Sequence, residues 1–449
     1  MTKTKPWYNT VQQVKGPLLF LEEIDSPKYG EICNINIHGR SVQGQVLEAT
    51  KDTAIVQVFG STLGINKDID VQFTGKPAQV EVSETMLGKT FDGLGRSISK
   101  TDIVPEKTLD VNGSAINPAA RTEPHRFIET GVSSIDSMIT LVRGQKLPVF
   151  SSAGLPHNKL ATQLLKQSNV KEDKFAIVFA AMGITKEESL YFKKELKLSG
   201  STQHTVSFIN LADDPSVERI MTPRVALTTA EYLAFEKDYH VLTILTDFTN
   251  YCESLREISA ARNEIPGRRG YPGYMYTDLA NLYERAGKLK GKPGSLTQIP
   301  ILTMPSGDKT HPVPDLTGYI TEGQITLDGS LNKKGIQPPI NPLESLSRLD
   351  ADEEDTRDDH GKVSDQLYTC YAKGTELRQL VAVIGEGSLG ETEKKYLAFA
   401  EAFEEEFLNQ GYQTSYSIEE TLEKAWETLR NLPKKELKKI SKDIKEKYY

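Results

Sequence analysis

The 449-residue sequence has little of what marks secreted or membrane-spanning proteins. Its three cysteines, Cys33, Cys252 and Cys370, are scattered and odd in number. They form neither a disulfide framework nor a metal-ligand cluster, which favours a reducing cytosolic location. The longest apolar run, residues 175–184, is about half the length that a helix needs to cross a bilayer. The first residues lack the apolar segment of a secretory signal, so we expect a soluble cytoplasmic chain.

An excess of positive charge is also absent. Lysine and arginine total 54 against 62 aspartate and glutamate residues, which leaves a formal net charge of −8. This balance argues against a general nucleic-acid or lipid-surface binder. Hydrophobic residues make up 38% and charged residues 26%, so the chain can bury apolar cores and wholesale disorder is excluded. The length indicates about three domains.

Residues 1–76 carry apolar residues at alternate positions. These are Ile35, Ile37, Val56, Val58, Ile69, Val71 and Phe73. Because an alternating strand hides one face and exposes the other to water, such short segments predict a small antiparallel β-barrel or β-sandwich. No chemistry is visible there, and a structural or assembly role follows.

Residues 77–350 mix short apolar runs with helical segments. The runs at 175–181 and 241–245 are bounded by charged or turn residues, as in buried parallel strands. Segments 159–167 and 228–236 have helical character. This alternation predicts a doubly wound α/β domain, which binds ligands at the carboxyl ends of its strands.

The last block, residues 351–449, opens within an acidic run at residues 350–359. We interpret this acidic run as a solvated linker. Ser417 and Glu420 form a capping box, and Gly411 ends an earlier helix. Apolar stripes at helical spacing comprise Phe399, Phe403 and Phe407, then Ile418, Leu422, Ala425, Trp426 and Leu429, and, after Pro433, Leu437, Ile440 and Ile444. Stripes of this kind build a core, so a helical bundle is predicted.

An intact phosphate-binding P-loop is missing. That motif needs glycines whose N–H groups wrap phosphates, a lysine for the phosphate charge and a hydroxyl for Mg²⁺. In the loop around Gly154, the first glycine, second glycine, lysine and hydroxyl positions hold Ser151, Pro156, His157 and Asn158. Pro156 has no N–H group, and a mostly neutral imidazole replaces a fixed ammonium. This is either an ordinary loop or a phosphate-binding loop that has lost most of its ability to bind phosphate.

Two later segments give this loop a context. Residues 241–247 have the form of a Walker B strand, whose terminal Asp247 would hold a Mg²⁺-bound water, although acidic residues also end ordinary core strands. Residues 338–348 read PPINPLESLSR. They fit the signature of the rotary ATPase alpha/beta family at every fixed position, including Pro339, Asn341, Ser345 and Ser347. A match of this length seldom arises by chance.

The chain resembles the B subunit (beta, regulatory) of V/A-type rotary ATPases nearly end to end. Further matching stretches are residues 130–136, 143–150, 266–274 and 315–320. The resemblance implies an N-terminal β-barrel, a central RecA-like, P-loop-type α/β nucleotide-binding domain and a C-terminal α-helical bundle. These correspond to the blocks 1–76, 77–350 and 351–449. The catalytic A subunit of the family has an intact P-loop and a long insertion near its first domain, and this sequence has neither.

A second catalytic feature is also replaced. Catalytic relatives carry Gly-Glu-Arg after the strand that follows the P-loop helix, and the glutamate orients the attacking water. Ile184 stands at that position, and an alkyl group can neither polarise water nor accept its proton. We interpret the nearby Glu187 and Glu188 as solvated charges at a helix start. The sequence therefore predicts a subunit that does not hydrolyse ATP by itself.

The resemblance implies that Arg348 acts in trans. In the family, the arginine after Ser-x-Ser reaches across the subunit interface toward the γ-phosphate held by the neighbouring catalytic chain. A guanidinium is always charged and can bind two oxygens. Arginine fingers contribute roughly 10³–10⁵ in rate in other phosphoryl-transfer systems. The alternative is a surface arginine that pairs with Asp350 or Asp352.

The resemblance also implies partners and ligands. Arg268, Arg269 and Tyr271 lie in a stretch similar to the family loop that faces the rotor shaft, although an ordinary Gly/Pro loop at a subunit contact fits equally well. The partners would be catalytic A subunits in an alternating hexamer, central-stalk and peripheral-stalk subunits and, indirectly, the membrane rotor, with no nucleic acid. We expect no metal site and no tightly bound cofactor in this chain, with Mg-ATP or Mg-ADP at the interface with the A subunit. The complex would lie on the cytoplasmic side of a membrane, as a peripheral assembly.

Three functions stay open from the sequence. The favoured one is a non-catalytic regulatory subunit that helps to couple ATP hydrolysis or synthesis to H⁺ or Na⁺ transport. The second is a self-sufficient hexameric ATPase of the export or helicase type. The third is a scaffold subunit that never binds nucleotide.

Overall fold

The computed structural model describes residues 5–37, 39–60, 62, 67–98, 103–113, 115–170 and 174–449. The chain divides into two compact units. The first unit comprises residues 1–117, 176–237 and 245–285, and the second comprises residues 118–175, 238–244 and 286–449.

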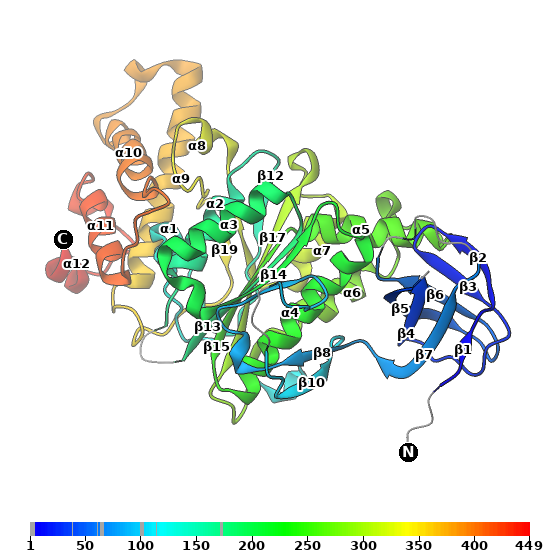
Figure 1. Cartoon of the computed structure of the whole chain (residues 1–449). Helices are drawn as coiled ribbons and strands as arrows, with labels where there is room; N and C mark the ends of the chain where they lie inside the picture. Colours follow the sequence, from blue (N-terminus) through cyan, green and yellow to red (C-terminus); the bar gives the residue numbers. More distant parts are fainter. Residues whose placement is uncertain are drawn as a thin grey trace. The chain divides into compact units, whose positions relative to one another are not determined.

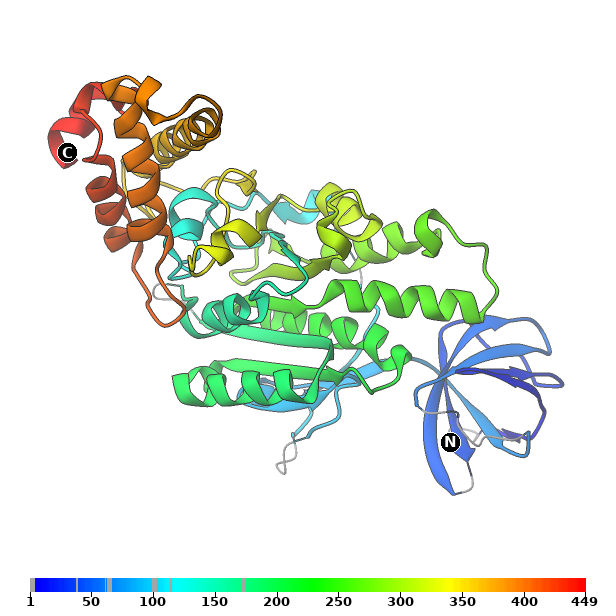
Figure 2. The ribbon, with the colours of Figure 1, turned by 90° about the horizontal axis from the view of Figure 1, so that it is seen from above.

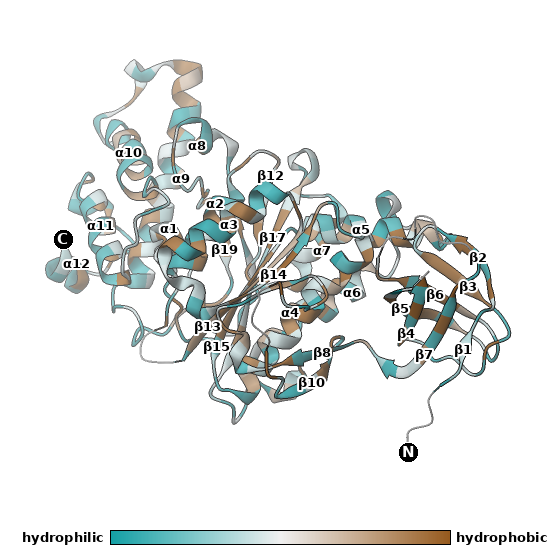
Figure 3. Cartoon of the chain, viewed as in Figure 1, coloured by the Kyte–Doolittle hydropathy of each residue, from teal (hydrophilic) through white to brown (hydrophobic). Residues whose placement is uncertain are grey.

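The amino-terminal part of the first unit is an antiparallel seven-stranded sheet in the order β1-β7-β4-β5-β6-β3-β2 (Figure 1). Its strands are β1 (Trp7–Tyr8), β2 (Val11–Lys15), β3 (Leu18–Leu21), β4 (Glu31–Ile37), β5 (Arg40–Ala49), β6 (Ala54–Val58) and β7 (Asp70–Pro77). Apolar and polar bands alternate along β4, β5 and β7 (Figure 3), and Ile35, Val56 and Val71 lie in the enclosed core. The predicted β-barrel domain is confirmed.

The remainder of the first unit contains three parallel strands in the order β13-β14-β9. Its elements are β8 (Gln79–Val82), β9 (Thr90–Asp92), β10 (Lys107–Asp110), β13 (Phe175–Ile184), α3 (Lys186–Ser199), β14 (Thr205–Leu211), α4 (Ser216–Glu236), α5 (Phe248–Ala261) and α6 (Met275–Tyr283). Strand β13 is buried along almost its whole length, which explains its continuous apolar sequence. The predicted helix 228–236 is only the second half of α4, because Pro223 interrupts the helical pattern without ending the helix.

Helix α3 begins with a capping box. The Thr185 hydroxyl accepts a hydrogen bond from the Glu188 N–H at 3.1 Å, and the Glu188 carboxylate accepts one from the Thr185 N–H at 2.8 Å. Glu187 is exposed in the first turn. The two glutamates are therefore helix-start charges, as predicted.

The α/β part of the second unit contains the parallel strands β18-β12-β17, with β19 antiparallel at one edge and β15 beside β17. Its strands are β11 (Arg121–Thr122), β12 (Val149–Ser152), β15 (His240–Thr246, which belongs to this unit up to Ile244), β16 (Gly287–Leu289), β17 (Ser295–Met304), β18 (Gly323–Thr326) and β19 (Leu346–Ser347). Its helices are α1 (Ser133–Met138), α2 (His157–Gln167), α7 (Pro312–Ile320) and α8 (Gly329–Lys333). Strand β15 and helix α2 confirm the predicted segments 241–245 and 159–167.

The carboxyl-terminal residues of the second unit form the predicted helical bundle (Figure 2). Its helices are α9 (His360–Ile384), α10 (Glu391–Ala402), α11 (Ile418–Leu429) and α12 (Lys442–Tyr448). The capping box of α11 is confirmed, since the Glu420 N–H donates to Ser417 Oγ at 3.2 Å. Two details differ from prediction. A π-helical turn at Phe403–Leu408 ends the helix before Gly411, and Leu437 and Ile440 reach the core from the segment before α12.

The acidic run is not a solvated linker throughout. Asp359 is fully buried, and its carboxylate accepts hydrogen bonds from Arg357 Nε at 2.6 Å and Trp426 Nε1 at 2.6 Å. The Asp355 carboxylate accepts one from Arg126 Nε at 2.6 Å. The linker prediction is wrong for these two residues because a run of like charge does not reveal which of its members have partners distant in the sequence.

The three cysteines are free thiols and all are buried. Burial raises the pKa of the Cys33 and Cys252 thiols well above the usual range, so they stay protonated at neutral pH. Among the described residues, no helix combines the length and the apolar character needed to span a bilayer.

Candidate functional site

The loop that corresponds to a P-loop connects β12 to α2 in the second unit. Ser151 lies at the end of β12 and is buried, and its Oγ is 3.3 Å from Nδ1 of His157 in the first turn of α2. Gly154 forms the exposed tip of the loop with a φ of +82°. The side chain in the position of the phosphate-binding lysine is thus an imidazole beside a hydroxyl.

Three consecutive positions of this loop, residues 155–157, have no free backbone N–H group to offer a phosphate. The N–H of Leu155 donates to the Ser152 carbonyl at 3.1 Å, and the N–H of His157 donates to the Leu155 carbonyl at 2.9 Å. Pro156 is the N-cap of α2 and has no N–H. Because a phosphate cradle depends on successive free N–H groups, these residues do not fit tight triphosphate binding.

Two further positions that the sequence analysis singled out lie in the first unit. Ile184 ends β13 with 4% of its surface exposed. Asp247 follows β15 and caps α5, and its Oδ1 accepts a hydrogen bond from the Thr249 N–H at 2.7 Å. Within the described residues, no group of three or more His, Cys, Asp or Glu side chains is arranged to hold a metal ion.

The signature residues 338–347 form a hydrogen-bonded brace beside β18 and the residues that follow it in the second unit. The Pro339 carbonyl accepts from the Asp328 N–H at 2.8 Å, and Asn341 Nδ2 donates to the Asp328 carboxylate at 3.0 Å. Ser345 Oγ accepts from the Thr326 N–H at 2.9 Å and donates to the Asn341 carbonyl at 2.7 Å. The signature side chains are therefore occupied in holding their own segment.

The brace leads directly to Arg348. Ser347 Oγ accepts a hydrogen bond from Gln145 Nε2 at 2.8 Å, and Ser347 pairs with Gly323 in the β18–β19 ladder. The Arg348 N–H then donates to the Glu322 carbonyl at 2.9 Å. The backbone of Arg348 is thus fixed by Glu322, which directly precedes β18, and by the preceding residue, Ser347, of the signature segment.

Lys146 fixes the acceptor of that last hydrogen bond. Its Nζ lies 2.6 Å from one Glu322 carboxylate oxygen, and its N–H donates to the other at 2.8 Å. The Lys146 side chain is 4% exposed, so the ion pair is well shielded on that side. Sequence patterns assign no role to Gln145, Lys146, Glu322 or Gly323. The available signal was the stretch 143–150, which matches the family and contains the first two.

The Arg348 side chain is exposed. Its Nη1 is 3.4 Å from the Thr321 carbonyl, and it makes no ion pair with any residue in the described ranges. Among the described residues, no ion pair joins Arg348 to Asp350 or Asp352, and the Asp352 carboxylate lies 3.5 Å from His125 Nε2. A guanidinium on a rigid base is therefore available for an anion from outside the chain.

The loop after α5 presents two arginines outward. Arg268 and Arg269 are exposed, and Arg269 has a φ of +54°. Tyr271 is 2% exposed, because its hydroxyl donates to Glu253 and its ring lies under the Arg256 guanidinium, 5.6 Å from the ring centroid. Tyr271 thus anchors the loop from inside.

Comparison with known proteins places these features in one family. Residues 131–347 match the model of the ATP synthase alpha/beta family, nucleotide-binding domain. Residues 11–75 match the beta-barrel domain of the same family, and residues 349–449 match the C-terminal domain of V and A type ATP synthase. The chain is also similar to the solved ATP synthase subunit NeqB from Nanoarcheaum equitans, with 41% identity over 93% of this chain and 100% of that chain, at a TM-score of 0.75.

Proposed function

Because the chain belongs to the ATP synthase alpha/beta family, with a C-terminal domain of the V and A type, we propose that it is the non-catalytic regulatory subunit of such a complex. It alternates with catalytic A subunits in a hexameric head. The head works as a peripheral part of a membrane complex on its cytoplasmic side. There it helps to couple ATP hydrolysis or synthesis to H⁺ or Na⁺ transport.

The first support for a non-catalytic role is the absence of groups that bind phosphate and activate water, in the loop between β12 and α2 and at the end of β13. Pro156 offers no N–H, and the N–H of His157 is already bonded within the loop. Ile184 occupies the position of the water-orienting carboxylate. Since both phosphate binding and water activation are impaired, hydrolysis within one chain is disfavoured. These features argue against the self-sufficient ATPase.

The observation that carries the proposal is the exposed guanidinium of Arg348, which makes no ion pair within the described residues and is held by a backbone that the signature residues fix. Negative charge spreads over the phosphoryl oxygens during transfer, and a preorganised cation stabilises it without further reorganisation. Arg348 therefore serves Mg-ATP or Mg-ADP bound by the neighbouring catalytic subunit. If no nucleotide approached it, the scaffold function would apply instead.

The proposal also includes contacts between this chain and the rotor. The outward-facing Arg268 and Arg269 are the groups that we propose to face the central stalk, with Tyr271 holding their loop in shape. Further contacts with peripheral-stalk subunits complete the assembly. Coupling to the membrane rotor is then indirect, through the stalk.

The test is ATP turnover by a head reconstituted from this chain and its catalytic partner. Arg348→Ala should lower turnover by about 10³-fold or more while the head still assembles, because the charge on the transferred phosphoryl loses its partner. Arg348→Lys should recover only a small part, since an ammonium lacks the planar fork. Arg40→Ala, at an exposed arginine of the barrel, is the matched control and should leave turnover unchanged.

Two outcomes would contradict the proposal. Near-normal turnover by the Arg348→Ala head would remove the role in trans. Steady hydrolysis by the purified chain alone would instead favour the self-sufficient ATPase.

A further inference from the structure

The first unit contains a cleft of about 830 Å³ between the barrel strands β5 and β6 and the helices α4, α5 and α6. This volume lies in the range of small-molecule sites, roughly 300–1,000 Å³. Part of its wall is apolar, with Val46, Met221, Leu255 and Ile258. The rest is polar, so the cleft combines a surface for packing with groups for hydrogen bonding.

Two buried donors in this cleft have no acceptor among the described residues. Gln57, on β6, is 5% exposed, and its Nε2 has no hydrogen-bond partner among the described residues. The Nε of Arg262, just after α5, likewise has none within the described part of the chain. A buried donor without an acceptor costs free energy. An oxygen-bearing ligand would relieve that cost at both groups.

The charges that line the cleft are balanced. Arg224 pairs with Asp278, and Arg262 Nη1 lies 2.9 Å from the Glu264 carboxylate. Tyr274 stands at the rim with 39% of its surface exposed, and desolvation raises the pKa of its hydroxyl to about 12, so it stays protonated at neutral pH. Since each cation already has a carboxylate, the lining does not select a strongly charged ligand.

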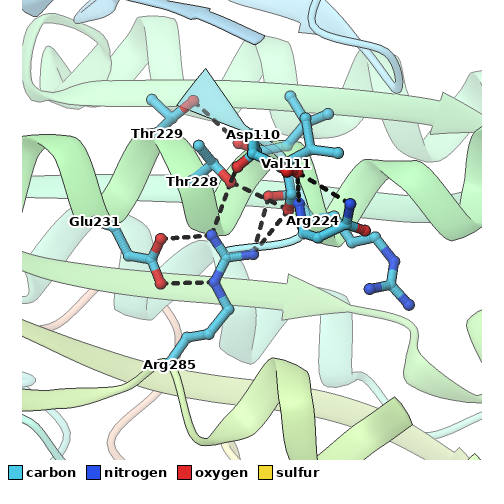
Figure 4. Close-up of polar contacts among 9 residues, drawn as sticks. Asp110, Val111, Arg224, Thr228, Thr229, Glu231 and Arg285 are labelled. Carbon is cyan, nitrogen blue, oxygen red and sulfur yellow. Dashed lines mark hydrogen bonds and ion pairs between the residues drawn. The ribbon is translucent and has the colours of Figure 1, made fainter. Parts of the chain in front are cut away.

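One wall of the cleft is fixed by a fully buried arginine (Figure 4). Arg285 Nη1 donates to the Val111 carbonyl at 3.1 Å, and its guanidinium binds both carboxylate oxygens of Glu231 on α4 at 2.7 and 2.6 Å. Gly113 of the cleft wall packs against this guanidinium with a φ of +56°, and a Cβ there would lie 2.5 Å from Arg285 Cζ. The wall is therefore held in place before any ligand binds.

We propose that this cleft binds an uncharged ring with adjacent hydroxyl groups, as found in a disaccharide or in the ribose of a nucleoside. A hydroxyl accepts from Gln57 Nε2 or Arg262 Nε and also donates to a neighbouring carboxylate, so one group satisfies both kinds of lining atom. The C–H face of the ring packs on the apolar wall. This site goes beyond the proposed function, which uses neither the barrel nor this cleft.

The test titrates the full-length chain with maltose and, separately, with adenosine, using calorimetry. We expect one of the two to bind at a single site, and the one that binds identifies the source of the hydroxyls. Gln57→Met keeps the length of the side chain but removes the donor, and it should weaken binding about tenfold. Asn281→Trp, at the exposed mouth on α6, should weaken binding by obstruction.

Gln13→Met makes the same exchange on an exposed barrel position outside the cleft, and it should leave binding unchanged. A thermal melt of each variant checks that it folds. The proposal is overturned if neither probe binds at about 10 mM, which would indicate a cleft filled by water only. Binding that is unaffected by Gln57→Met or by Asn281→Trp would overturn it equally, because a probe that ignores the cleft occupies another site.

Discussion

At the scale of single residues, the position of Arg348 depends on groups that contact its backbone or its neighbours rather than its guanidinium. Its guanidinium is exposed, while Glu322 holds its backbone and Lys146 holds Glu322. Ordering a backbone costs conformational entropy, so a backbone that is already fixed reduces the free energy that an approaching anion must supply. The signature sequence predicts the arginine, but the ion pair beneath it joins residues far apart in the chain.

The sequence predicted which catalytic groups are missing from this chain better than it predicted which side chains are buried. The absent N–H of Pro156 and the alkyl side chain of Ile184 follow from the identity of the residue at each position alone. The burial of Asp359 and of Tyr271 depends on Trp426 and Glu253, which lie elsewhere in the sequence. A charge or ring pattern carries no information about such distant partners.

The buried glutamate at the start of α4 gives a prediction with a definite pH dependence. Desolvation, with repulsion from Asp92 and Asp214, raises the pKa of Glu218 from 4.5 to about 7. The folded state therefore binds more protons than the unfolded state between these values, and the free energy of unfolding falls as pH rises through that window. Glu218→Gln cannot ionise, so it should gain stability relative to the native chain as pH rises.

The measurement compares the melting temperatures of Glu218→Gln and the native chain at about pH 5 and about pH 8. The difference should shift in favour of the variant at the higher pH. An equal difference at both pH values would show that Glu218 titrates no differently in the folded chain.

At the scale of elements, the β18–β19 pair links the sheet of the second unit to the signature segment. Gly323 has a φ of +135°, and a Cβ there would lie 2.0 Å from the Leu346 carbonyl oxygen. Only glycine allows the two strands to approach so closely. The position of Arg348 thus depends on a residue that carries no side chain at all.

Gly323→Ala should push β19 away and displace Arg348. Because a misplacement of about 1 Å can cost about 10²-fold in rate, turnover of the reconstituted head should fall on that scale. Gly329→Ala in α8 is the matched control, since an added Cβ there has no atom within 4 Å. Equal turnover by the two variants would mean that the strand contact does not position the arginine.

Helices and strands whose apolar residues follow a regular pattern were predictable from the sequence. Elements whose backbone departs from the regular helical repeat were not. Strand β13 is apolar throughout and α11 has its capping box in the sequence. The π-helical turn at Phe403–Leu408 keeps the aromatic rings stacked, with centroids of Phe403 and Phe407 at 5.2 Å, while it changes the helical register. Such a change arises from tertiary packing rather than from local sequence.

At the scale of the whole molecule, the C-terminal helices share a core with earlier residues of the second unit. Phe127, Leu331 and Ile336 belong to the same apolar cluster as Phe399 and Trp426. The predicted boundary between 77–350 and 351–449 stays a prediction, but the core crosses it. Burial of each large apolar side chain contributes about 1.5–3 kcal/mol, so neither side is expected to keep its stability alone.

A chain that ends at residue 350 should therefore aggregate or bind a hydrophobic dye, because the removal of the helices exposes Phe127, Leu331 and Ile336. Solubility and a thermal melt, with the full-length chain as reference, check this. A soluble fragment that melts cooperatively would show that the two sides fold independently.

The central claim is that this chain lends its guanidinium to a nucleotide held by another subunit. The most direct measurement is a structure of the reconstituted head with Mg²⁺ and a non-hydrolysable ATP analogue. We predict the Arg348 guanidinium at about 3 Å from a γ-phosphate oxygen of the nucleotide bound by the catalytic subunit. A γ-phosphate held instead by His157 and Asn158 of the same chain, with Arg348 facing solvent, would contradict the account.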